Sequence, residues 1–161
     1  MGERRTGYQV IEGVLGRLDP GELPYLPDVW EIHTANPTEM DGTREHLLSS
    51  GIVPQMAEWA PVVVSFLGTA LADTVKDEIS DQARAGARRA ARFAGRRARR
   101  RREAKALATD PLPSLSVERC QLIAGKVYAR ARELGMPETK ARLLLEAVLA
   151  ELLRTGTTPE A

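Results

Sequence analysis

The spacing of hydrophobic residues predicts a chain built from helices. In residues 6–18 these side chains recur every three or four positions, which is the repeat of one buried helix face. The face consists of Tyr8, Ile11, Val14, Leu15 and Leu18. Asp19, Pro20 and Gly21 then form a strong turn signal. We therefore predict that residues 1–60 contain only short helices and proline-rich acidic loops.

A long gap between prolines marks the second predicted element. No proline occurs between Pro61 and Pro111, and proline is the residue that most strongly interrupts a helix interior. Small or hydrophobic residues recur every three or four positions through this gap, from Gly68 to Ala94. We predict one amphipathic helix over residues 61–105, about 68 Å long. Its last part forms an arginine-rich arm.

Two more helices are predicted after a linker at residues 106–116. The first begins near Val117, with Ser114 or Ser116 as its cap, and ends at Gly135. The second follows after a tight turn, so residues 117–161 are expected to form a helical hairpin. A helix-turn-helix is the alternative for this segment.

The second helix of the predicted hairpin has a wide apolar face. A face of this width usually contacts two neighbours, which favours assembly into a homo-oligomer. The residues expected to mediate this assembly are Leu144, Leu145, Val148, Leu149 and Leu152.

Length and composition favour a single all-α domain. The chain has 161 residues, 43% of them hydrophobic and only 4% aromatic, which is typical of a helical globular protein. The predicted architecture is a long central amphipathic helix, short N-terminal helices and a C-terminal helical hairpin. The single cysteine, Cys120, excludes an internal disulfide. Its place on a hydrophobic stripe predicts a buried structural thiol.

Charge is distributed very unevenly along the chain. Residues 1–83 carry fourteen acids and five bases, and residues 106–161 carry seven of each. Between them lies a basic block interrupted by only one acid, Glu103. The block comprises Arg84, Arg88, Arg89, Arg92, Arg96, Arg97, Arg99, Arg100, Arg101, Arg102 and Lys105. These side chains are the candidate polyanion-binding residues.

Nucleic acid is the first candidate ligand for this basic block. Arginine pairs with phosphate oxygens through two parallel hydrogen bonds. The block lacks asparagine and has Phe93 as its only aromatic residue, which disfavours base readout and base stacking. The sequence therefore predicts phosphate binding without base specificity.

Three other interpretations of the basic block remain open. An anionic membrane surface would attract it, with the apolar segment 60–72 inserting beside it. That segment is too short to span a bilayer. An acidic protein partner, a second copy, or the acidic N-terminal region of the same chain would pair with it electrostatically. In the third interpretation, the basic block is a solvated helix face without a ligand.

No catalytic, metal or cofactor site is predicted. The only histidines, His33 and His46, lie in segments without a matching nucleophile or metal-ligand spacing. We therefore expect a protein without enzymatic activity. The polar N-terminal residues predict no secretory signal, which indicates a cytoplasmic location, with association at a membrane surface as the alternative. The strong preference for arginine over lysine suggests a bacterial, GC-rich genome.

Overall fold

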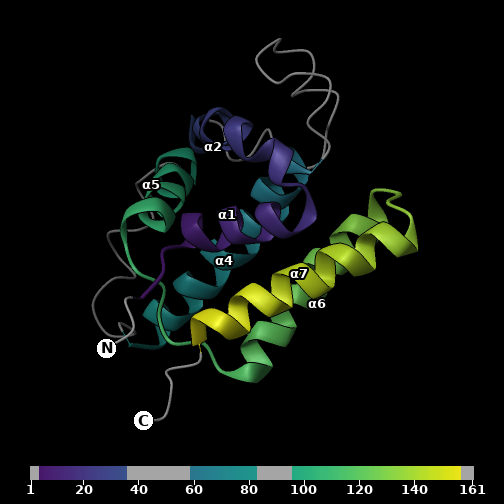
Figure 1. Cartoon of the computed structure of the whole chain (residues 1–161). Coiled ribbons are helices and arrows are strands. Elements are labelled where there is room, and N and C mark those ends of the chain that lie inside the picture. Colours follow the sequence, from purple (N-terminus) through teal and green to yellow (C-terminus); the bar gives the residue numbers. More distant parts are fainter. Residues whose placement is uncertain (1–3, 36–58, 83–95, 157–161) are drawn as a thin grey trace.

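A computed structural model of the protein describes residues 4–35, 59–82 and 96–156. Within these residues the regular structure is helical, with no strand, and the predicted all-α class is confirmed (Figure 1). The elements are α1 (Gly7–Leu18), the 3-10 helix η1 (Pro20–Tyr25), α2 (Leu26–Ala35), α4 (Ala60–Gln82), α5 (Arg96–Thr109), α6 (Val117–Glu133) and α7 (Glu138–Gly156).

Helix α1 forms where the hydrophobic repeat predicts it. Thr6 caps its first turn by accepting a hydrogen bond from the backbone N–H of Gln9, while the Gln9 side chain accepts one from the backbone N–H of Thr6. These reciprocal bonds satisfy backbone donors that a helix start leaves unpaired. The buried face includes Ile11, Val14 and Leu15. Burial of this face fixes α1 against the rest of the core.

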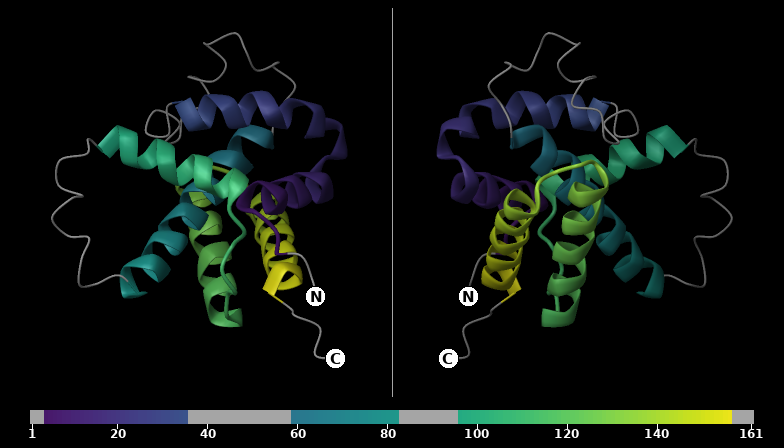
Figure 2. Two further views of the ribbon diagram at one scale, coloured as in Figure 1. Left: turned by 90° about the vertical axis from the view of Figure 1, so that its left-hand side faces the viewer. Right: turned by 90° about the vertical axis from the view of Figure 1, so that its right-hand side faces the viewer.

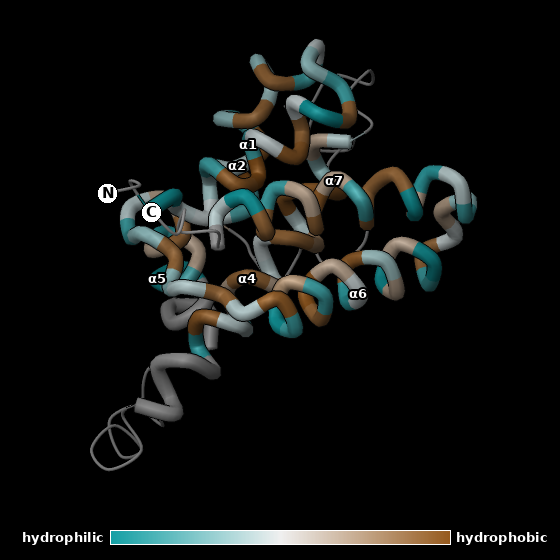
Figure 3. Tube along the Cα trace, turned by 60° about the horizontal axis from the view of Figure 1, so that its bottom comes forward, coloured by the Kyte–Doolittle hydropathy of each residue, from teal (hydrophilic) through white to brown (hydrophobic). Residues whose placement is uncertain are grey.

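Helix α4 is the central element of the core. It contacts α1, α2, α5 and α6, and its hydrophobic positions lie in the middle of the described helices (Figure 3). Ala60, Val63, Val64, Leu67 and Leu71 are completely buried. The apolar segment 60–72, which the membrane interpretation requires, is therefore part of the protein core.

A buried carboxylate stabilises the start of α4. Glu22, on η1, is 3% exposed, and its side chain accepts hydrogen bonds from the backbone N–H groups of Trp59 (2.8 Å) and Ala60 (2.7 Å). These two donors have no acceptor within their own helix. A negative charge at this end also complements the helix dipole. Glu22 thereby ties η1 to α4.

The prediction of one continuous helix over residues 61–105 is wrong. Helix α4 ends at Gln82, α5 begins at Arg96, and the two helices contact each other. In one straight helix these two residues would be about 20 Å apart along the axis, and no such contact would form. Residues 83–95, including Arg84, Arg88, Arg89 and Arg92, lie outside the described part of the chain.

Burial explains why α5 packs back onto the core. Its residues Ala104 and Leu107 are each 3% exposed. Leu107 lies against Gly7 at the start of α1, where an added Cβ atom would be only 2.9 Å from the Leu107 Cδ2 atom. A straight extension of α4 would leave Leu107 in water. Packing on α1, α2 and α4 removes its apolar surface from solvent.

The predicted C-terminal hairpin is confirmed. Helices α6 and α7 lie side by side in opposite directions (Figures 1 and 2). Ser116 caps α6, and Gly135 in the turn has a positive φ of 86°, a conformation that glycine adopts without strain. Helix-turn-helix motifs cross at a steep angle, so that alternative is wrong. The hairpin packs on α4 through α6 and on α1 through α7.

The residues expected to mediate oligomerisation are largely used inside one chain. Leu144, Val148 and Leu152 are completely buried, and Leu145 and Leu149 are partly buried against the same core. Their assignment to an intermolecular contact requires correction, because α1 and α6 cover the wide apolar face of α7. Self-association itself remains a prediction.

Candidate polyanion-binding surface

The candidate surface is the exposed face of α5 at Arg101, Arg102 and Lys105. All three residues are exposed, while Ala104 and Leu107 face the core. Arg102, Lys105 and Thr109 are three and four positions apart, which places them on one helix face. The packing of Leu107 against α1 therefore fixes which way these cations face.

Among the described residues, no ion pair between a carboxylate and the side chains of Arg101, Arg102 or Lys105 is found. The Arg101 Nε atom donates to the backbone oxygen of Ala35 at 2.9 Å, at the C-terminal end of α2, where the helix dipole favours a cation. A guanidinium has five N–H donors, and this is the one bond that Arg101 donates to the described residues. Within the described residues, Arg102 and Lys105 make no hydrogen bond or ion pair through their side chains.

The structure describes three of the eleven predicted binding residues in full. The side chains of Arg101, Arg102 and Lys105 are on the exposed face of α5. Four more predicted residues belong to the first turns of α5, but their side chains are outside the described set: Arg96, Arg97, Arg99 and Arg100. The α5 surface therefore consists of Arg101, Arg102 and Lys105.

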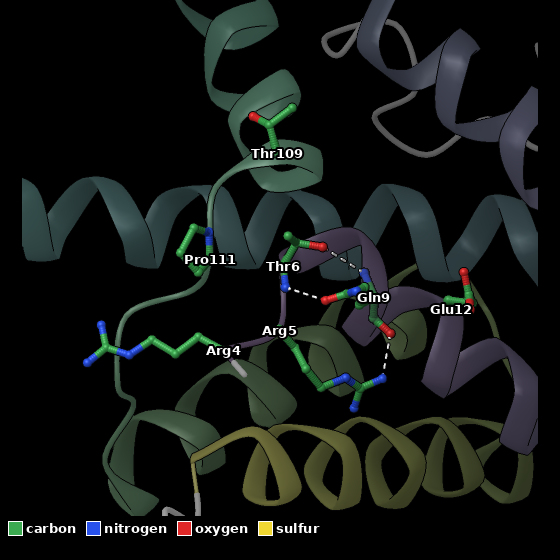
Figure 4. Close-up of a pocket in the computed structure, with 7 residues that line it drawn as sticks. All are labelled: Arg4, Arg5, Thr6, Gln9, Glu12, Thr109 and Pro111. Atoms are coloured by element: carbon green, nitrogen blue, oxygen red, sulfur yellow. Dashed lines mark hydrogen bonds between the residues drawn. The ribbon is translucent and has the colours of Figure 1, made fainter. Parts of the chain in front are cut away.

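A cleft lies beside the C-terminal end of α5, and the sequence alone did not indicate it. It has a volume of about 560 Å³ and is formed by the N-terminal segment, α1 and the end of α5 (Figure 4). Its lining consists of Arg4, Arg5, Thr6, Gln9, Glu12, Thr109 and Pro111. The cleft adds two arginines near α5 that lie outside the basic block.

One buried ion cluster joins the N-terminal part of the chain to α7. The Glu151 carboxylate is 1% exposed and accepts hydrogen bonds from Arg5 and from Arg17, the latter at 2.6 Å. Burial alone would raise the pKa of Glu151, but the hydrogen bonds and positive charges of Arg17 and Arg5 outweigh it and hold that pKa below its usual value. This cluster has a structural role, and its contact with Glu151 engages the Arg5 guanidinium.

His33 is buried between α2 and α4. It is 3% exposed, its ring lies 5.6 Å from the Trp30 ring, and its Nδ1 atom has no hydrogen-bond partner among the described residues. Gly68 of α4 allows this approach, since an added Cβ would be 3.1 Å from His33 Nε2. Burial lowers the pKa of His33 to about 4, so the ring is neutral near pH 7.

Other reactive groups offer little chemistry in the described part of the chain. The Cys120 thiol is 1% exposed, as predicted, and burial raises its pKa, which keeps it protonated and unreactive. No group of three metal-ligating side chains forms among the described residues. His46 lies outside them.

None of the helices in residues 4–35, 59–82 and 96–156 combines the length and the hydrophobicity needed to cross a bilayer.

Comparison with known proteins finds nothing similar. No family model, curated protein or solved structure matches the chain.

Proposed function

We propose that the protein binds nucleic acid through the phosphate backbone, using the exposed face of α5. The observation that carries this proposal is the group of exposed cations at Arg101, Arg102 and Lys105, without a carboxylate partner among the described residues. Phosphate oxygens accept charge-assisted hydrogen bonds from such groups. Binding releases the counterions that surround the nucleic acid.

The composition of α5 favours backbone contact over base readout. The helix contains seven basic residues and neither asparagine nor glutamine, the side chains that read adenine edges. Phosphate contacts position a protein on nucleic acid but carry no sequence information directly. The proposed activity is therefore binding that depends on charge and is independent of base sequence.

Nucleic acid is preferred over an anionic membrane because of where segment 60–72 lies. A peripheral membrane protein combines basic residues with apolar side chains that enter the lipid. The apolar residues of this segment, including Val63, Val64 and Leu67, are buried in the core. Membrane binding would then depend on electrostatic attraction alone. Such binding is expected to be weaker and reversible.

Neutralisation of the α5 surface tests the proposal. The variant R101Q/R102Q/K105Q is expected to bind a short fluorescein-labelled DNA duplex at least tenfold more weakly in fluorescence anisotropy at physiological salt, a loss of about 1.4 kcal/mol or more. Glutamine is a good helix former, so α5 itself should be retained.

A matched control variant distinguishes the loss of the α5 surface from a general loss of positive charge. K126Q/R132Q/R142Q removes the same number of charges from exposed positions on the hairpin. It should change DNA affinity by less than about twofold, because exposed charges far from the contact are screened at physiological salt. Equal losses in both variants would contradict a specific role for α5. Vesicles of anionic lipid that bind more tightly than DNA would favour the membrane function instead.

A further inference from the structure

The cleft at the end of α5 is built by a contact between distant parts of the chain. Residues Thr6 and Pro111 form an isolated antiparallel bridge, and the backbone N–H of Leu112 donates to the backbone oxygen of Arg5 at 2.9 Å. These bonds hold the segment before α1 beside the segment after α5. Arg4 is therefore kept close to the end of the proposed binding helix.

The two arginines of the cleft are in different situations. Arg5 donates to the buried Glu151 carboxylate and to the backbone oxygen of Gln9 at 2.7 Å. Arg4 is exposed and makes no side-chain hydrogen bond or ion pair with the described residues. Its side chain extends away from Arg5 and Gln9 (Figure 4). Within residues 4–35, 59–82 and 96–156 the Arg4 guanidinium is therefore available for a ligand, whereas Arg5 is committed to the fold.

Thr109 connects this cleft to the α5 surface. It lines the cleft together with Arg4, and its spacing from Arg102 and Lys105 puts it on their helix face. Arg4 is two residues from Thr6, and Thr109 is two residues from its bridge partner Pro111. These four residue steps reach at most about 14 Å, the bridge adds about 5 Å, and one helical turn from Thr109 to Lys105 rises about 5 Å. Arg4 and Lys105 therefore lie closer together than one turn of duplex, about 34 Å. One strand of nucleic acid is long enough to contact both.

We infer that the cleft is an additional phosphate subsite of the same polyanion, with Arg4 as its binding residue. This inference rests on the proposed function of α5 and adds a contact outside the basic block. The ligand it takes is a phosphate group of the backbone, held by the two parallel N–H donors of the guanidinium.

One carboxylate restricts where that phosphate lies. Glu12 lines the cleft at the other end from Arg4 (Figure 4). Glu12 repels a phosphate in the cleft, so the phosphate is expected at the end that holds Arg4. Removal of the Glu12 charge is consequently expected to strengthen binding.

The salt dependence of DNA binding tests the subsite. R4Q is expected to weaken binding of the labelled duplex about threefold to tenfold, and to make the slope of log affinity against log salt less steep by about 0.9, the value for one lost phosphate contact. E12Q should strengthen binding about twofold. K126Q, which removes one exposed charge from α6, is the control and should change neither quantity measurably. Arg4 and Glu12 are exposed, so thermal unfolding of both variants should match the unmodified protein.

The possible outcomes distinguish the subsite from the proposed function. If R4Q and E12Q behave as K126Q does while R101Q/R102Q/K105Q loses binding, the subsite is overturned and the α5 surface stands. If the α5 variant binds as tightly as the unmodified protein, the proposed function fails and the subsite fails with it. Weaker DNA binding by R4Q and stronger DNA binding by E12Q, together with weaker binding by the α5 variant, support both the subsite and the proposed function.

Discussion

Replacement of Glu151 by alanine is expected to lower the free energy of unfolding by about 3 kcal/mol. The carboxylate is buried and joins α7 to Arg5 and Arg17. Its removal leaves the partly buried Arg5 guanidinium without its anion. Loss of one partner from a buried pair typically costs about 3–5 kcal/mol. The lower value is expected because Arg17 is half-exposed and stays hydrated after the substitution.

Urea unfolding at neutral pH measures this effect. Glu146, an exposed acid on the same helix, provides the control, since E146A should change stability by less than about 0.5 kcal/mol. Gly13→Ala should also destabilise the protein, because a Cβ at that position would collide with the Glu151 carboxylate and the Arg5 guanidinium. Equal stabilities of E151A and E146A would mean that the cluster does not hold α7 to the N-terminal segment.

The second large effect expected is acid destabilisation through His33. Its pKa in the folded protein is about 4, against about 6.5 in an unfolded chain. Between these values the unfolded state binds more protons, so stability decreases as the pH falls from 6.5 to 4. A difference of about 2.5 pH units corresponds to a loss of about 3 kcal/mol. The stability is fully present above pH 6.5.

Comparison of H33L with the unmodified protein isolates the histidine. Leucine retains an apolar side chain beside Trp30 but cannot bind a proton. The free energy of unfolding is measured with denaturant at a series of pH values. For H33L it should lose most of its pH dependence between pH 6.5 and 4. Below about pH 4.5 the free energy of unfolding of H33L should still decrease with falling pH. The reason is that Glu151 has a lowered pKa, and its contribution to stability disappears as it is protonated. An unchanged pH profile in H33L would contradict the burial of His33 as a neutral ring.

Local periodicity was sufficient to predict much of the fold. The faces of α1, α6 and α7 follow from hydrophobic repeats of three or four, and the turn between α6 and α7 follows from Gly135 and Pro137. These features depend on residues close in sequence. The hydrophobic repeat did not predict the separation of α4 from α5, because a repeat describes a helix face and does not specify whether two helical segments are continuous.

Long-range contacts explain what the sequence did not reveal. Leu107 packs on Gly7, Glu22 caps α4, and Glu151 pairs with Arg5 at a separation of 146 residues. Each partner looks ordinary within its own segment; Glu151 even occupies a buried position among leucines. Arg4 was overlooked for the same reason, since only the bridge between Thr6 and Pro111 brings it near α5. The basic residues themselves were evident from composition.

Salt titration of DNA binding is the most direct test of the central claim that α5 contacts phosphate. For the unmodified protein, log affinity should fall linearly with log salt concentration. If Arg101, Arg102 and Lys105 each neutralise one phosphate, R101Q/R102Q/K105Q should have a slope less steep by up to about 2.7. Affinity that is insensitive to salt, or an identical slope for the variant, would contradict the claim.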